Sequence, residues 1–232
     1  MISADLRINA QKLKNQKMAK YIHFRNPNSE AIEKLLEGIP TTPGTCFFID
    51  IVGSTRIKYK SGLKTWGRML NNTFNFISIL NEFPDNVVKG IGDEIMLYIP
   101  DSELKQKSAY TDYFSLLLEI YATIDNIKNF PLEGLFLPCK VAIHYCTDAY
   151  NITFLEGAND YYGKDIDLTA RLTAKAIANR IVMSEAFYRK ALTDYEEKYS
   201  QNLHRAMDNV SEKYMEDFKG IPHPTGYRVI DV

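Results

Sequence analysis

One short run, Thr45–Val52, constrains the fold most strongly, because it is almost wholly apolar and carries a single acid, Asp50. An apolar run of this length is typical of a strand that is buried on both faces. A Gly-Ser-Thr corner follows at 53–55. We therefore expect a buried strand that ends at Asp50.

A second acid, Asp93, lies in the stretch "KGIGDEIML" at 89–97, which predicts two strands joined by a tight turn. Helical spacing of apolar residues predicts helices over 64–82 and 102–128, and alternation predicts a strand over 139–146. The order β-α-β-β-α-β is the ferredoxin-like arrangement, with helices on one face of an antiparallel-containing sheet. In that topology Asp50 and Asp93 converge.

The rest of the chain adds elements around this α+β core. We expect a helix from 163, a strand at 180–184, further helix over 184–210, and a closing hairpin within 218–232. Residues 1–38 read as one or two helices, broken near Pro27. The predicted domains are an N-terminal helical leader and linker at 1–43 and a catalytic unit at 44–232.

Composition narrows the function classes. The 232 residues carry 28 basic and 29 acidic side chains, so the near-zero net charge does not favour a nucleic-acid partner. The polar N-terminus and the lack of a long apolar run predict no secretion signal and no stable membrane insertion. Three cysteines fit reduced thiols in a cytoplasmic protein. His144 and Cys146 share one strand face, where core packing is favoured over a metal site.

Two carboxylates at neighbouring strand ends raise each other's pKa, and a divalent cation relieves their repulsion. Oxygen-only ligands favour Mg²⁺ or Mn²⁺. The alternative is that Asp50 and Asp93 are ordinary turn residues. Their matched positions favour metal binding, with two ions able to activate an attacking oxygen and hold a departing pyrophosphate.

Four motifs in order resemble those of class III nucleotidyl cyclases: "FFIDIVGST", "KGIGDEIM", "DYYGKDIDLTARL" and "FKGIPHP…YRV". The resemblance covers about residues 44–230 and implies cyclisation of a nucleoside triphosphate with release of pyrophosphate. It implies that Asp50 and Asp93 hold the metal ions, with the Ile51 carbonyl as a further ligand. It also assigns phosphate oxygens to the backbone N–H groups at the helix start, those of Val52, Gly53, Ser54 and Thr55.

Further roles follow from the resemblance. Arg171 matches the family's transition-state arginine, and Lys219 is the best match to a late lysine that grips the polyphosphate. At the family's ribose-binding asparagine this chain has Asp167, which can accept a hydrogen bond from a ribose hydroxyl but cannot donate one when ionised. A helix-surface role for Asp167 stays open. The family builds each site between two head-to-tail subunits, so the resemblance implies a homodimer with composite sites.

Lys89 and Asp160 stand at the family's base-reading positions. A lysine donor and an aspartate acceptor suit adenine, disfavour GTP, and do not exclude uracil or cytosine. Tyr161 and Tyr162 could fill the pocket around a smaller ring by stacking, or could simply pack in the core. A compact cyclase of this kind is similar to the pyrimidine cyclases of bacterial anti-phage (Pycsar) systems, in which a separate effector reads cUMP or cCMP. We therefore favour UTP or CTP, with ATP as the alternative.

Two rival interpretations remain. Diguanylate cyclases share the paired acids, but they carry a doubled glycine before Asp-Glu-Phe, whereas this chain has "IGDEIM". A pseudo-cyclase that only binds a partner is disfavoured by the presence of Asp50, Asp93 and Arg171, although Asp167 would suit it.

Overall fold

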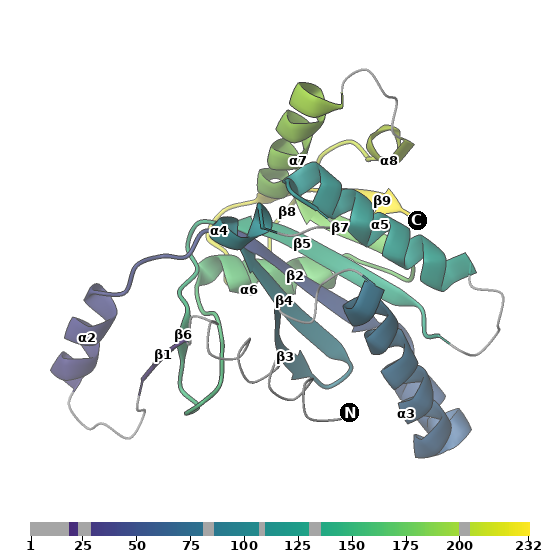
Figure 1. The fold of residues 1–232 in the computed structure, drawn as a ribbon, viewed down its shortest axis with the longest axis horizontal. Helices are drawn as coiled ribbons and strands as arrows, with labels where there is room; N and C mark the ends of the chain where they lie inside the picture. Colours follow the sequence, from purple (N-terminus) through teal and green to yellow (C-terminus); the bar gives the residue numbers. More distant parts are fainter. Residues whose placement is uncertain (1–18, 23–28, 81–85, 107–109, 130–135, 200–204) are drawn as a thin grey trace, which may run out of the picture.

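The computed structural model describes residues 19–22, 29–80, 86–106, 110–129, 136–199 and 205–232. Seven strands form the central sheet (Figure 1). All neighbouring strands are antiparallel except β5 and β7, which are parallel. In spatial order the strands are β3 (Val87–Ile91), β4 (Glu94–Pro100), β2 (Gly44–Ile51), β5 (Cys139–Cys146), β7 (Arg180–Ser184), β9 (Thr225–Asp231) and β8 (Tyr214–Glu216).

Strand β2 lies in the interior of this sheet, between β4 and β5, as its apolar run predicts. Its residues alternate between two separate apolar cores. Phe47 and Ile49 enter the larger core, whereas Cys46 and Phe48 enter a smaller one on the opposite face. The expected α+β fold with a β-α-β-β-α-β order is confirmed for the first part of the sheet.

Helices cover both faces of the sheet, whereas the sequence predicted helices on one face. The helices α3 (Ser54–Leu80), α5 (Tyr113–Asn129) and α7 (Glu185–Lys198) contribute to the larger core. Helix α6 (Lys164–Thr173) covers the opposite face, where its Ile166 and Leu172 join the smaller cores (Figure 1). The difference arises because α6 belongs to the added αβ unit, after the ferredoxin-like core is complete.

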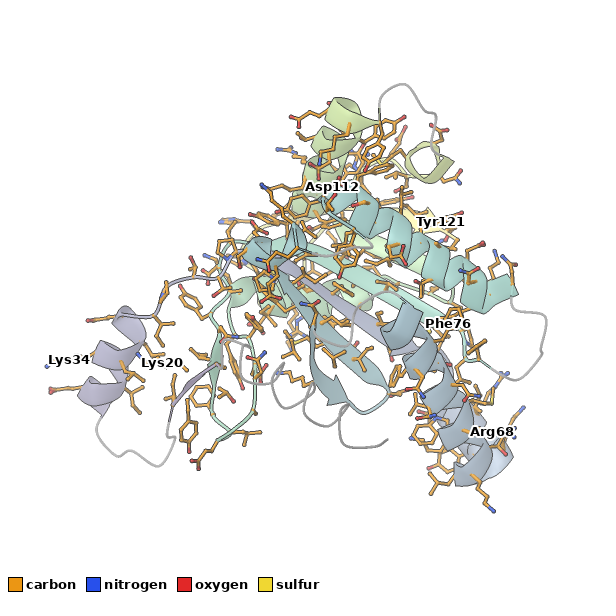
Figure 2. All side chains as sticks on the ribbon, in the orientation of Figure 1. Lys20, Lys34, Arg68, Phe76, Asp112 and Tyr121 are labelled. Atoms are coloured by element: carbon orange, nitrogen blue, oxygen red, sulfur yellow. The ribbon has the colours of Figure 1, made fainter. Side chains whose placement is uncertain are left out.

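The outer helices are held together by a buried acid. Asp112, next to the start of α5, is 4% exposed and lies 2.9 Å from Lys198 Nζ at the end of α7 (Figure 2). A charge that is buried this deeply needs a partner. The ion pair therefore joins two helices on the same face of the sheet.

Helix α3 starts ten residues earlier than its apolar periodicity predicts. It begins at Ser54 and is interrupted at Gly62, which has φ 71° and ψ 165°. Glycine tolerates this backbone conformation, so the chain can turn there and continue as a second helical segment. The segment before Gly62 carries few apolar residues, which is why the sequence did not reveal it.

Other boundaries also moved. The predicted helix over 102–128 is two helices, α4 (Asp101–Leu104) and α5, and the predicted helix over 184–210 is α7 followed by α8 (Arg205–Asp208). The closing hairpin begins at β8, four residues before the predicted stretch.

The prediction of N-terminal helices with a break near Pro27 is confirmed for residues 29–37 and wrong for residues 20–21. Residues 20–21 form the short strand β1 (Lys20–Tyr21), which pairs with β6 (Ile152–Thr153). Helix α2 (Ser29–Glu37), which carries Lys34, projects away from the sheet (Figures 1 and 2). Residues 1–18 and 23–28 lie outside the described residues, and the division at residue 43 stays a prediction.

Gly163 sets the close approach between the loop after β5 and the start of α6. Its φ is 147°, and a Cβ there would lie 2.1 Å from the carbonyl oxygen of Asp148. We expect Gly163→Ala to lower the free energy of unfolding by about 2–4 kcal/mol, because the backbone must shift. Urea denaturation measures the change.

The matched control is Gly67→Ala within α3, where the new Cβ meets no atom within 4 Å. This substitution should be neutral or stabilise the protein by up to ~1 kcal/mol. A Gly163→Ala protein as stable as the wild type would contradict the tight packing at residue 148.

Candidate active site

Three charged residues meet at the end of β2. Asp50 pairs across the sheet with Glu94 of β4 on one side and with Lys140 of β5 on the other. Directly opposite residues project from the same face of a sheet, so the three side chains are neighbours. Lys140 Nζ lies 2.9 Å from Asp50 Oδ2, and each side chain is 22% exposed. We call Asp50, Asp93, Glu94 and Lys140 the acid cluster.

Asp93 is joined to this cluster through the backbone. Its carbonyl oxygen accepts a hydrogen bond of 3.3 Å from the N–H of Ile51, the last residue of β2. The turn between β3 and β4 is thus tied to the end of β2. The structure brings Asp50 and Asp93 together, as the ferredoxin-like topology requires.

The surroundings of Glu94 shift the pKa of its carboxyl. Burial, together with the charges of Asp50 and Asp93, raises the pKa of its carboxyl to about 7, and Lys140 opposes the shift. Neither Glu94 nor Lys140 was among the predicted site residues. Lys140 is the one lysine in the strand "CKVAIHYC", and this could have drawn attention to it. It projects from the same face of the sheet as Asp50, its partner on β2.

The cluster fits a hard divalent cation. Its donors are carboxylate oxygens, which Mg²⁺ and Mn²⁺ prefer. Burial is the main cause of the raised pKa of Glu94, and repulsion from Asp50 and Asp93 adds to it, so a cation here would offset that repulsion as the Lys140 ammonium already does in part. Asp50 and Asp93, with the carbonyl of Ile51 at the strand end, are the residues that would hold the ion.

The Gly-Ser-Thr corner differs in one respect from its predicted role. The N–H of Val52 donates to the carbonyl oxygen of Pro138 at 2.8 Å, so it is not available to a phosphate. Gly53 has φ 73°, and its carbonyl accepts from Ile57. The N–H groups of Gly53, Ser54 and Thr55 stand at the start of α3, where a helix lacks intrahelical acceptors.

A tryptophan fixes Ser54 in this corner. Trp66, from the segment of α3 beyond Gly62, donates its indole N–H to Ser54 Oγ at 2.8 Å. Lys58 Nζ lies 4.1 Å from the centre of the Trp66 ring. The bend at Gly62 thereby returns the second segment to the helix start, a contact that the sequence alone did not suggest.

The two predicted base-reading residues contact each other. Lys89 Nζ lies 2.9 Å from both carboxylate oxygens of Asp160. Tyr161 is 7% exposed and stacks on Tyr98 at 3.9 Å between ring centres, so its ring belongs to the core. The ring of Tyr162 is instead exposed and lies 5.3 Å from Lys89 Nζ. Tyr162 is therefore the tyrosine that could contact a ligand.

Helix α6 presents Asp167 and Arg171 to solvent. Both side chains are exposed and lie one turn apart, whereas Ile166, Thr169 and Leu172 face the sheet. Lys219 is exposed in the turn after Phe218. Asp167 and Arg171 stand on the outer side of α6, which covers the face of the sheet onto which Asp50 and Lys89 project.

Comparison with known proteins decides the family. The family model described as "Adenylate and Guanylate cyclase catalytic domain" matches residues 40–215. The chain belongs to this family. None of the curated proteins compared matches this chain.

Solved structures share the fold of this cyclase domain at low sequence identity. The adenylyl cyclase CyaB from P. aeruginosa is 18% identical with a TM-score of 0.60, over 82% of this chain and 97% of that one. The guanylate cyclase domain of RhGC from Catenaria anguillulae, in complex with GTP, is 16% identical with a TM-score of 0.58, over 82% and 96%. An adenylate cyclase from Trypanosoma brucei is 18% identical with a TM-score of 0.58, over 83% and 91%.

In the described ranges no helix is both long enough and apolar enough to cross a membrane.

Glu94 makes the stability of the cation-free cyclase domain depend on pH. Its folded-state pKa of about 7 lies above the ordinary 4.5, so the folded chain binds this proton more tightly than the unfolded chain. The free energy of unfolding should therefore fall as pH rises from about 4.5 to about 7. Glu94→Gln removes this decline, and the variant should gain stability relative to wild type across that range.

Urea unfolding in the presence of a chelator, at several pH values from 5 to 8, measures the effect. Glu212→Gln, at an exposed position in the sequence before β8, is the matched control. Parallel pH curves for wild type and Glu94→Gln would show that the carboxyl is not perturbed in this way.

Proposed function

We propose that this cyclase domain converts a nucleoside triphosphate to a 3′,5′-cyclic nucleotide and pyrophosphate. The observation that carries the proposal is the acid cluster at the end of β2, together with a separate base-reading pair, Lys89 and Asp160, on the same side of the sheet. A cation bound by the cluster would lower the pKa of the attacking ribose hydroxyl and stabilise charge on the phosphates.

The chain's own residues would do the rest. The N–H groups of Gly53, Ser54 and Thr55 would hold phosphate oxygens at the start of α3. Lys140, which already neutralises Asp50, would add positive charge beside the same phosphates. Arg171, exposed on α6, would offset charge on the α-phosphate in the transition state, and Lys219 would bind the polyphosphate.

We propose a homodimer in which each site is shared. Arg171 and Asp167 point outward from α6, away from their own sheet, so they would complete the site of a partner chain. Asp167 would accept a hydrogen bond from the ribose. Asp50 and Asp93 of one subunit would thus work with Arg171 of the other.

For the base, we propose a pyrimidine, with ATP as the alternative. Lys89 Nζ can donate to a carbonyl of uracil or cytosine, and Asp160 can accept from uracil N3–H or the cytosine amino group. The exposed ring of Tyr162 beside Lys89 could stack on the smaller base. The same donor and acceptor suit adenine N1 and its amino group, which supports the alternative. A role in anti-phage defence, with a separate effector reading the product, stays a prediction from sequence resemblance.

The shared site predicts complementation between inactive variants. Asp50→Ala and Arg171→Ala homodimers should each lose at least about a hundredfold in pyrophosphate release, because each lacks electrostatic stabilisation. Co-expressed with different affinity tags and purified as a mixed dimer, they should regain about half of wild-type activity, since one of two sites is intact.

The matched control is a mixed dimer of Asp50→Ala with Asp93→Ala, which removes the same half of both sites and should stay inactive. Wild-type activity in the Asp50→Ala homodimer would overturn the proposed chemistry. Inactive single variants without recovery in the mixed dimer would place each site within one chain.

The choice of base is tested by incubating the purified protein with each of the four nucleoside triphosphates and Mn²⁺. Mass spectrometry then identifies the cyclic product. We expect cUMP or cCMP; cAMP would establish the alternative, and the absence of any cyclic product would favour the pseudo-cyclase interpretation.

A further inference from the structure

A second group of metal-binding side chains lies apart from the acid cluster, under the start of α6. His144 and Cys146 project from β5, and Asp165 comes from the first turn of α6. One ligand atom from each lies within 4.8 Å of the others. Sequence reasoning saw only the first two residues and favoured core packing; the third joins them through the fold.

The two ring nitrogens of His144 differ: Nδ1 is oriented by a hydroxyl, and Nε2 makes no hydrogen bond within the described part of the chain but faces a carboxylate oxygen of Asp165 at 3.4 Å. Its Nδ1 lies 2.7 Å from Ser184 Oγ, which also accepts from the N–H of Phe187 at the start of α7. His144 is 5% exposed, and its Nε2 has no hydrogen-bonding partner among the described residues. A buried polar atom that makes no hydrogen bond destabilises the fold, and a bound metal ion would satisfy it. A metal-bound histidine usually donates its other ring N–H to an oxygen, as Ser184 Oγ allows.

Asp165 places an ionised carboxylate next to His144 Nε2. Its Oδ2 accepts hydrogen bonds from the N–H groups of Thr147 and Asp148, each at 2.7 Å. Its Oδ1 is directed at His144, 3.4 Å from Nε2. Burial opposes ionisation, but His144 and the two N–H groups outweigh it and lower the pKa of Asp165 to about 2.

Cys146 supplies the sulfur. It is fully buried, and Cys46, on the neighbouring strand β2, lies beside it. Binding of a metal ion would replace the thiol proton, which would leave to solvent. One nitrogen, one sulfur and one oxygen donor suit Zn²⁺ and not Mg²⁺, which prefers oxygen alone.

We propose that His144 Nε2, Cys146 Sγ and Asp165 Oδ1 form a Zn²⁺ site, with water or Cys46 in the fourth position. The ion would join β5 to the first turn of α6. It would thereby fix the helix that carries Asp167 and Arg171, without belonging to the acid cluster.

Cobalt substitution tests the site in the full chain. Purified protein, treated with a chelator and then titrated with Co²⁺, should show a thiolate-to-cobalt charge-transfer band that saturates at one ion per chain. Zn²⁺ should abolish the band, and a large excess of Mg²⁺ should not. Cys146→Ser and His144→Ala should lose the band, whereas Asp50→Ala should keep it.

Cys139→Ser is the matched control, because Cys139 lies on the same strand but faces the larger core; it should keep the band. Asp165→Asn can still accept the two backbone N–H groups, so it should fold and weaken Zn²⁺ binding about tenfold or more in competition with a chromophoric chelator. Absence of the band in the wild type, its retention in Cys146→Ser, or wild-type Zn²⁺ affinity in Asp165→Asn would overturn the proposal. Circular dichroism confirms that each variant is folded.

Discussion

Asp50 lies between Glu94 and Lys140 in a register that the sheet does not allow to change. A slip of one residue would move Phe47 and Ile49 into the smaller core and Phe48 into the larger one, so packing on both faces also holds Asp50 in place. The repulsion between neighbouring carboxyls cannot be relieved by moving the strands apart. It is relieved instead by protonation of Glu94, by the Lys140 ammonium, or by a cation.

This constraint explains why the site stands where it does. The end of β2 and the turn before β4 are tied by the Ile51–Asp93 hydrogen bond, so the acids meet at the rim of a rigid sheet and not on a free loop. The helix start that follows β2 places N–H donors beside them, and Trp66 holds Ser54 there from beyond the bend at Gly62. A negative cluster beside a positive helix end can bind a cation and a phosphate together.

Helix α6 gives the second face of the sheet two different roles. Its inner side buries Ile166 and Leu172 and brings Asp165 to His144 and Cys146, whereas its outer side carries Asp167 and Arg171. An ion or a packing change beneath the first turn of α6 would therefore alter the positions of Asp167 and Arg171 on its outer side. The opposite face of the sheet is covered by α3, α5 and α7, which pack on the larger core.

The sequence by itself determined the core strands, their order and the convergence of Asp50 with Asp93, because apolar periodicity and turn residues act locally and the ferredoxin-like topology follows from their order. It did not reveal α3 before Gly62, the strand β1, or α6 on the second face, because each depends on contacts with distant segments. Only the tertiary structure decided that Lys140 and Glu94 flank Asp50, and that the N–H of Val52 donates to the carbonyl of Pro138. It also decided that Tyr162 is exposed while Tyr161 is buried, and that the carboxylate of Asp165 lies beside His144. These are pairings across strands or between a helix and a strand, and linear spacing carries no information about which side chains they bring into contact.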